Sequence, residues 1–228
     1  MSRLLHCEGM TNYKLCGGTA LARCWLEHRV SYDLDLFFPE GFDARTMSAA
    51  IKRAGINLQV TDMVDDPKKA NQLHGYIDDG ELLKVSFVED AYYDIYPAII
   101  RSLGGVNVAT EDIAGLYHRK LRTVSGNGSG DTVEGGRQKA RDVFDLYVLS
   151  KTHMPLLEFM DTVPYSFPKI AFFEGLAAMP WFELIDELGE IVCDEQWESG
   201  KDVEIVQNGL LMQIGAQIIV DEVSGFEL

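Results

Sequence analysis

The chain has 228 residues, of which 46% are hydrophobic and 25% charged, and its formal net charge is −16 at pH 7. This composition is that of a globular protein, and the length suits one large domain or a domain with a helical addition. No apolar run reaches the ~18–20 residues that span a bilayer, and the N-terminus has no apolar signal-peptide core, so the sequence predicts a cytoplasmic protein without a membrane partner.

The acidic charge restricts the partners. A general nucleic-acid binder is basic, because phosphate neutralisation dominates its affinity. We therefore expect a small nucleotide accompanied by Mg²⁺, or a basic partner protein, and we expect any polynucleotide acceptor to meet a local patch. The four cysteines and five histidines show no CxxC or HExxH spacing, which favours reduced thiols over a zinc site.

A glycine turn precedes the first predicted helix after the N-terminal segment. Gly17 and Gly18 lack a β-carbon, so their N–H groups can approach a ligand closely. Thr19 is the expected N-cap of a helix in which apolar residues recur at i,i+4 as far as Leu26. A glycine-rich turn that leads into a helix N-terminus is a site suited to phosphate.

Two aspartates follow on a segment with a period of two. Residues 31–38 alternate between two faces, which predicts a strand that carries Asp33 and Asp35 on the same face. Their backbones would lie roughly 6.5–7 Å apart, and their repulsion is on the order of 2–3 kcal/mol at an effective dielectric of about 20. A bridging cation removes this repulsion. Mg²⁺ (or Mn²⁺) is the candidate, because Mg²⁺ takes one or two carboxylates and completes its shell with water and phosphate.

The same stretch resembles the AbiEii/AbiGii-type (MenT-like) nucleotidyltransferase toxins, a family of the nucleotidyltransferase superfamily. Their signature is Gly-Gly-Thr-x-Leu followed by Arg-x-Ser-x-Asp-(Leu/Ile)-Asp. The residues that match the signature are Gly17, Gly18, Thr19, Leu21, Arg29, Ser31, Asp33, Leu34 and Asp35. The alternative interpretation of these residues is a solvated strand with a glycine turn before an ordinary helix.

The resemblance extends over roughly residues 13–150 and implies Mg²⁺-dependent nucleotidyl transfer from a nucleoside triphosphate to a hydroxyl group. It implies a toxin of a toxin–antitoxin or phage-defence system, with a cognate antitoxin as partner, and some relatives act on tRNA ends. The metal would be held by Asp33 and Asp35. The nucleotide would be held by Gly17, Gly18, Thr19, Arg29, Ser31 and Lys120.

The rest of the predicted sheet follows up to residue 110. A helix is expected over 43–54, with Asp43 as its N-cap and Gly55 as its end. Strands are expected over 58–64, 72–77 and 82–88, the last two joined as a hairpin, and Val106 and Val108 suggest a final strand. The wider superfamily often has a third metal-binding carboxylate on a strand like 82–88. Here Ser86 holds that position, with Lys84 on the same face as a supporting residue.

From residue 111 the pattern becomes helical. Thr110 is the expected cap of a helix that carries Lys120, and a glycine-rich loop over 125–136, read as a surface loop or a substrate flap, leads to a second helix. A lysine followed by an Arg-Asp-x-x-Asp-Leu block is a recurrent motif in the resembled family. Lys120 would neutralise phosphate charge. Asp142 would orient this lysine, accept a proton from the attacking hydroxyl, or hold sugar or metal, whereas Asp145 could instead form a helix-surface pair with Arg141.

The sequence therefore predicts an α/β fold of the α+β kind. A nucleotidyltransferase-like twisted mixed sheet flanked by helices would occupy residues 1–110, and a mostly helical region over 111–228 would complete the active-site cleft. Residues 155–228 read as short helices, with 210–220 either helix or buried strand. Two other functions fit the same motifs: transfer to a small molecule, as in antibiotic adenylyltransferases, and a degenerate domain that only binds a nucleotide or partner.

Overall fold

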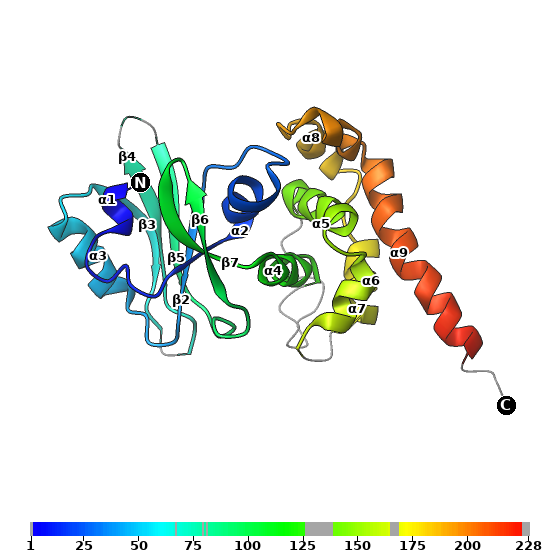
Figure 1. The fold of residues 1–228 in the computed structure, drawn as a ribbon, viewed down its shortest axis with the longest axis horizontal. Helices are drawn as coiled ribbons and strands as arrows, with labels where there is room; N and C mark the ends of the chain where they lie inside the picture. Colours follow the sequence, from blue (N-terminus) through cyan, green and yellow to red (C-terminus); the bar gives the residue numbers. More distant parts are fainter. Residues whose placement is uncertain are drawn as a thin grey trace. The chain divides into compact units, whose positions relative to one another are not determined.

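The computed structural model describes residues 2–66, 68–78, 80, 82–125, 139–164 and 169–224, with only the backbone at 125, 171 and 215–224. The chain forms two compact units, Met1–Leu116 and Tyr117–Leu228 (Figure 1). The division falls after Leu116, whereas the sequence predicts it after residue 110. The predicted loop at 125–136 lies almost wholly outside the described residues.

The first unit is built on a mixed sheet. The described part of the chain contributes seven strands to it in the order β3-β4-β5-β2-β1-β7-β6. The pairs β2–β5 and β1–β7 are parallel and the others antiparallel, which confirms the predicted mixed sheet. The strands are β1 (Lys14–Cys16), β2 (Leu34–Phe38), β3 (Leu58–Val64), β4 (Gln72–Asp78), β5 (Leu82–Glu89), β6 (Ala98–Leu103) and β7 (Val106–Glu111).

Local sequence signals explain several elements of this unit. The helix α3 (Ala44–Arg53) begins where Asp43 Oδ1 accepts the Thr46 N–H at 2.5 Å, and this N-cap confirms the prediction. It ends before Gly55, whose φ of +69° favours glycine. β4 and β5 form the predicted antiparallel hairpin. β6 is not predicted from the sequence, because its exposed edge position gives it no alternation of burial.

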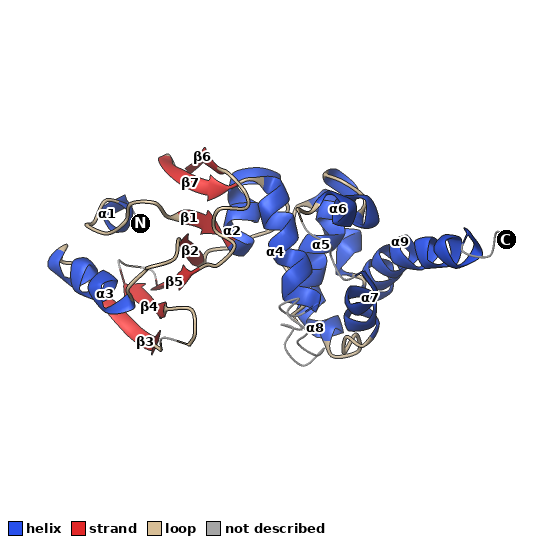
Figure 2. Ribbon diagram, turned by 90° about the horizontal axis from the view of Figure 1, so that it is seen from below, coloured by secondary structure: helices blue, strands red, loops and turns tan. Residues whose placement is uncertain are grey.

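The two faces of the sheet differ in character. Leu36, Phe87 and Leu73 are neighbours in register on one face and are fully buried, and the short helix α1 (Ser2–Leu5) and α3 cover this face (Figure 2). The helix α2 (Gly17–Ala20) lies on the other side. The alternation of side chains therefore separates an apolar face from a polar face.

The second unit is helical in its described residues. Tyr117 on α4 (Ile113–Ser125) stacks on Phe159 with ring centroids 4.0 Å apart, and its hydroxyl donates to Met154 O at 3.2 Å. Burial of this ring raises the pKa of Tyr117. The other helices are α5 (Ala140–Thr152), α6 (Leu156–Thr162), α7 (Lys169–Ala177), α8 (Leu184–Gly189), the 3₁₀ helix η3 (Glu195–Lys201) and α9 (Val203–Ser224).

Two open points about helices are settled by these residues. Residues 210–220 belong to α9 and are helical. The prediction that Thr110 caps α4 is wrong, because Thr110 lies in β7 and donates to Leu15 O at 2.9 Å. Asp112 does the capping instead: its Oδ1 accepts the Gly115 N–H at 2.8 Å. No helix of the described residues combines the length and the hydropathy needed to cross a bilayer.

Candidate active site

The glycine turn lies directly against the predicted site residues. Gly17 begins α2 with a φ of +69°, and a β-carbon there would collide with the carboxylate of Asp35. A β-carbon on Gly18 would collide with the guanidinium of Arg29 and lie 3.3 Å from the Ser31 hydroxyl. The turn thus needs both glycines, because three polar side chains reach its backbone.

The hydroxyl groups of this turn are held by each other. Thr19 Oγ1 and Ser31 Oγ lie 2.9 Å apart and share a hydrogen bond, and both side chains are buried. Thr19 lies inside the helical segment, so its predicted role as N-cap is wrong; the cap position belongs to Cys16. The turn instead passes into a π-helix, Leu21–Leu26, a rare geometry that often occurs at functional sites.

The two aspartates lie at the start of β2. The strand begins at Leu34, so Asp33 directly precedes the strand, whereas the sequence predicts both acids within it. Leu34 and Leu36 are buried while Asp33 and Asp35 are half-buried. This alternation continues through Asp33 and fits two carboxylates on the polar side of the sheet.

The neighbouring strand provides the two supporting residues. Asp35 pairs with Ser86 of β5 in parallel register, and Leu34 pairs with Val85. Continuing that register by one residue brings Lys84 opposite Asp33. Lys84 is exposed and Ser86 is buried. The polar face therefore carries a hydroxyl beside Asp35 and an ammonium group on the strand next to Asp33.

The residues present fit a hard divalent ion that is mostly held by other ligands. Within the described residues no three His, Cys, Asp or Glu side chains gather closely enough to hold a metal ion on their own. Mg²⁺ needs no such cage, because it binds through one or two carboxylates plus water and phosphate oxygens. The half-buried Asp35, packed on a glycine that leaves its carboxylate room, is such a ligand.

The second predicted cluster lies in the helical unit. Lys120 Nζ lies 2.6 Å from Asp142 Oδ1 and 2.7 Å from Asp145 Oδ2, and the three side chains are 6%, 1% and 0% exposed. Asp145 is thus buried on Lys120, while Arg141 is exposed, so the alternative of a helix-surface pair does not describe Asp145. The cluster joins α4 to α5, and removing one member of such a buried group costs about 3–5 kcal/mol.

The structure contains a cluster of arginines and aromatic rings that is not predicted from the sequence. We call it the Arg/aromatic cluster, and its members are Arg23, Trp25, Tyr32 and Arg101. The Arg101 guanidinium lies 4.0 Å from the Trp25 ring centroid, and that of Arg23 lies 6.0 Å from the ring of Tyr32. Burial raises the pKa of the nearby Cys24 thiol, and the positive charges of Arg23 and Arg101 offset part of this increase in pKa. Contact between η1 and β6 brings Arg101 to Trp25, and no local pattern reveals such a contact.

The cysteines fit reduced thiols. All four lie among the described residues, and none forms a disulfide. Cys7 and Cys16 are buried, whereas Cys24 and Cys193 are half-buried. Burial also raises the pKa of Cys7 and of Cys193, so these thiols are poor nucleophiles at neutral pH.

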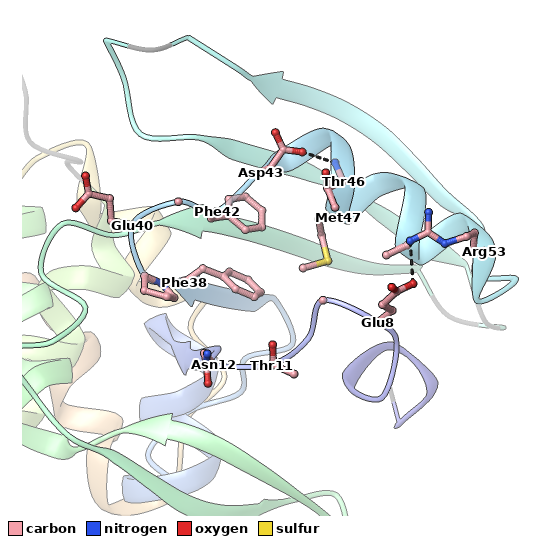
Figure 3. Close-up of a pocket in the computed structure, with 14 residues that line it drawn as sticks. Glu8, Thr11, Asn12, Phe38, Glu40, Phe42, Asp43, Thr46, Met47 and Arg53 are labelled. Carbon is pink, nitrogen blue, oxygen red and sulfur yellow. Dashed lines mark hydrogen bonds and ion pairs between the residues drawn. The ribbon is translucent and has the colours of Figure 1, made fainter.

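A cavity of about 350 Å³ lies between α3, the segment that precedes β1 and the end of β2 (Figure 3). Phe38, Phe42 and Met47 form its apolar wall, and α3 contributes Arg53, which pairs with Glu8 at 2.9 Å. None of the predicted site residues lines this cavity. We therefore assign the candidate active site to the glycine turn and the polar face.

Comparisons with known proteins point in the same direction. Residues 1–169 match the profile of a family described as nucleotidyl transferase AbiEii toxin, Type IV TA system. The fold is similar to that of a proposed nucleotidyltransferase from H. pylori, with a TM-score of 0.54, 19% identity, and coverage of 99% of this chain and 92% of that one. It is also similar to JHP933 from Helicobacter pylori, with a TM-score of 0.52, 20% identity, and coverage of 98% and 88%. No curated protein matches the sequence.

Proposed function

Because this chain belongs to the AbiEii nucleotidyltransferase toxin family, we propose that it moves a nucleoside monophosphate from a nucleoside triphosphate to a hydroxyl acceptor with Mg²⁺ or Mn²⁺ as cofactor. The observation that carries this proposal is the glycine turn packed against Asp35, Arg29 and Ser31. A phosphate needs close backbone N–H groups and a cation, and a metal needs a carboxylate. The turn offers these groups side by side.

We assign the phosphates to the turn at Gly17, Gly18 and Thr19, with Arg29 and Ser31 as further donors. Asp33 and Asp35 would hold the metal ion. When bound, such an ion neutralises charge on the transferring phosphoryl group and aligns it with the acceptor. The attacking hydroxyl oxygen forms a bond to the α-phosphorus, and pyrophosphate leaves.

We assign supporting roles to the lysine cluster of the helical unit. Asp142 and Asp145 fix the Lys120 ammonium group within 2.7 Å, and a lysine held in this way is a positioned point charge. Such a charge suits an anionic ligand, and Asp142 would keep it oriented. Two anionic partners also compete with phosphate for the same ammonium group, so we expect the cluster to contribute to stability as well.

For the acceptor we propose an RNA end, such as that of tRNA. The support is the Arg/aromatic cluster, because arginines beside rings bind phosphates and stack on bases. Tyr32 is 66% exposed and lies between the site residues Ser31 and Asp33 in the chain. Such a patch is what a chain with a net charge of −16 needs for an anionic acceptor. As a toxin of this kind, the protein would act in the cytoplasm and be countered by a cognate antitoxin.

Binding of the nucleotide is tested by thermal denaturation. We expect a nucleoside triphosphate with Mg²⁺ to raise the melting temperature, because a ligand that binds only the folded state stabilises it. Asp33→Ala should abolish this gain. Asp78→Ala, which removes an exposed acid at the end of β4, serves as the matched control and should keep it. Equal gains in the wild type and Asp33→Ala would refute the site.

Two alternatives depend on separate observations. Ser86 beside Asp35 leaves no acid on that strand position, which favours a domain that only binds a nucleotide or partner. The acidic surface favours a small-molecule acceptor over a polynucleotide. Incubation of labelled nucleoside triphosphates with total RNA and, in parallel, with small hydroxyl compounds distinguishes the proposal from both alternatives. Label in RNA supports the proposal, label in a small compound supports the small-molecule acceptor, and binding without any product supports the binding domain.

A further inference from the structure

A row of polar side chains crosses the sheet next to the candidate site. Asp35 of β2 pairs with Ser86 of β5, Ser86 pairs with His74 of β4, and His74 pairs with Asp62 of β3. Side chains that are paired in register lie on the same face. His74 is therefore two strands from Asp35, roughly 10 Å at the backbone, and only the short Ser86 lies between them.

The imidazole of His74 is oriented by its own strand. His74 Nε2 lies 2.9 Å from Gln72 Oε1. A carboxamide oxygen can only accept, so Nε2 donates and Nδ1 is the acceptor of the ring. The side chain is half-exposed, in contrast to Leu73 and Ile77 on the other face of β4, which are buried. A ligand on the polar face can thus reach this ring.

Within the described residues of the sheet unit, the charged groups nearest to His74 on the polar face lie on its own strand and on the neighbouring strands. Asp62 lies opposite on β3, Lys84 lies on β5 two residues from Ser86, and Asp78 lies on the same strand. Asp35 follows beyond Ser86. The charges of α3 lie on the apolar side of the sheet, because α3 packs there (Figure 2). The imidazole therefore has acidic residues on both sides across the polar face, Asp62 on β3 and Asp35 on β2.

On the basis of the proposed function, we propose that His74 is the general base of the transfer. The acceptor hydroxyl gives its proton to His74 Nδ1 while its oxygen forms a bond to the α-phosphorus. The bond from that phosphorus to the bridging oxygen breaks, and pyrophosphate takes the electron pair. The space over Ser86, between the carboxylate of Asp35 and the imidazole, is where the attacking oxygen lies.

The test compares His74→Gln with the wild type and with His6→Gln, which removes an exposed histidine of the N-terminal segment. The assay uses labelled nucleoside triphosphate with total RNA or a small hydroxyl compound, whichever gives product with the wild type. We expect His74→Gln to lower kcat about 10²–10⁴-fold. The acid limb of the pH–rate profile should disappear, and the nucleotide-induced gain in melting temperature should remain. His6→Gln should behave as the wild type.

A second variant tests the role of Ser86. His74→Gln combined with Ser86→Asp places a carboxylate on β5, between Asp35 on β2 and position 74 on β4. We expect part of the kcat to return. The acid limb of the pH–rate profile should then lie at lower pH, because a carboxylate is a weaker base than imidazole. A His74→Gln variant with wild-type kcat and an unchanged pH profile overturns the assignment while leaving the proposed function intact. A wild type that binds nucleotide but gives no product with either acceptor overturns both.

Discussion

The two units each contain a pair of neighbouring aspartates, and the two pairs meet different surroundings. Asp33 and Asp35 are half-buried at the start of β2, next to a glycine turn. Asp142 and Asp145 are fully buried one helical turn apart, and both contact the ammonium group of Lys120. Two aspartate pairs with similar spacing in the sequence therefore lie in different electrostatic environments.

The difference shows what each pair can do. The buried pair is neutralised within the protein, since two carboxylates out of water require a cation at hydrogen-bond distance. The half-buried pair remains within reach of solvent, ions and phosphates. We therefore expect a ligand at the pair of the sheet unit, whereas the pair of the helical unit is held by ion pairs to Lys120. The variants below test this comparison, beginning with the largest expected effect.

Replacing an acid of the half-buried pair should remove activity without removing stability. We expect Asp35→Asn to lower the transfer rate at least about a thousandfold, because a catalytic metal ion contributes several kcal/mol and about 1.4 kcal/mol is a factor of ten. The melting temperature without ligand should fall far less than in a variant of the buried lysine cluster, because Asp35 is only half-buried. Glu40→Gln, an exposed acid just after β2, is the control. A stable Asp35→Asn variant with wild-type activity would contradict the assignment.

Removing the lysine of the buried cluster should lower stability, in contrast to the replacement of Asp35. Lys120→Met leaves Asp142 and Asp145 buried without their lysine, and we expect it to lower the free energy of unfolding by about 3–5 kcal/mol in chemical denaturation. Adding Asp142→Asn and Asp145→Asn to this variant should recover part of the loss. Lys151→Met, at an exposed position of α5, should cost less than about 1 kcal/mol. A loss no greater than this control would show that the cluster is not structural.

A smaller effect is expected at the glycine turn. Gly17 and Gly105 have φ values of +69° and +81°, so alanine at either costs roughly 1–2 kcal/mol of stability. Only at Gly17 does the new β-carbon collide with Asp35, whereas at Gly105 it meets open space. We expect Gly17→Ala to lose at least as much stability as Gly105→Ala, and only Gly17→Ala to lose the nucleotide-induced gain in melting temperature. A retained gain in Gly17→Ala would separate the turn from nucleotide binding.

The smallest effect concerns an acid satisfied by a helix end. The side-chain and backbone hydrogen bonds of Thr46 lower the pKa of Asp43. A pKa that is lower in the folded state contributes stability above the unfolded value of about 3.9, and the contribution disappears as the pH falls through the folded value. Asp43→Ala should therefore cost about 1 kcal/mol at pH 7. In denaturation at several pH values, this difference should vanish under strongly acidic conditions; a constant difference would exclude the cap as its source.

Local chemistry explains which parts of the fold could be predicted. The cap at Asp43, the hairpin of β4 and β5, and the alternation in β2 depend on neighbouring residues, so the sequence reveals them. Thr19 and Thr110 were misassigned as caps because each hydroxyl finds a partner far away in the chain, Ser31 and Leu15 O. A pattern of residue types cannot reveal such long-range bonds.

The candidate site likewise contains residues that the sequence reveals and residues that only the structure brings together. The signature with Asp33 and Asp35 is visible in the sequence because its members lie within one short stretch. The row from Asp35 through Ser86 to His74 requires the strand order β2-β5-β4, and the Arg/aromatic cluster requires contact between η1 and β6. Tertiary register determines both, so only the structure reveals them.

Binding of Mn²⁺ tests the central claim most directly, since Mn²⁺ can replace Mg²⁺ and is observed by electron paramagnetic resonance. In the presence of a nucleoside triphosphate, we predict that the wild type and Asp145→Asn bind the ion alike and that Asp33→Asn/Asp35→Asn binds it no more than nucleotide alone does. Binding that survives in Asp33→Asn/Asp35→Asn and is lost in Asp145→Asn would place the metal site on the buried pair and contradict this account.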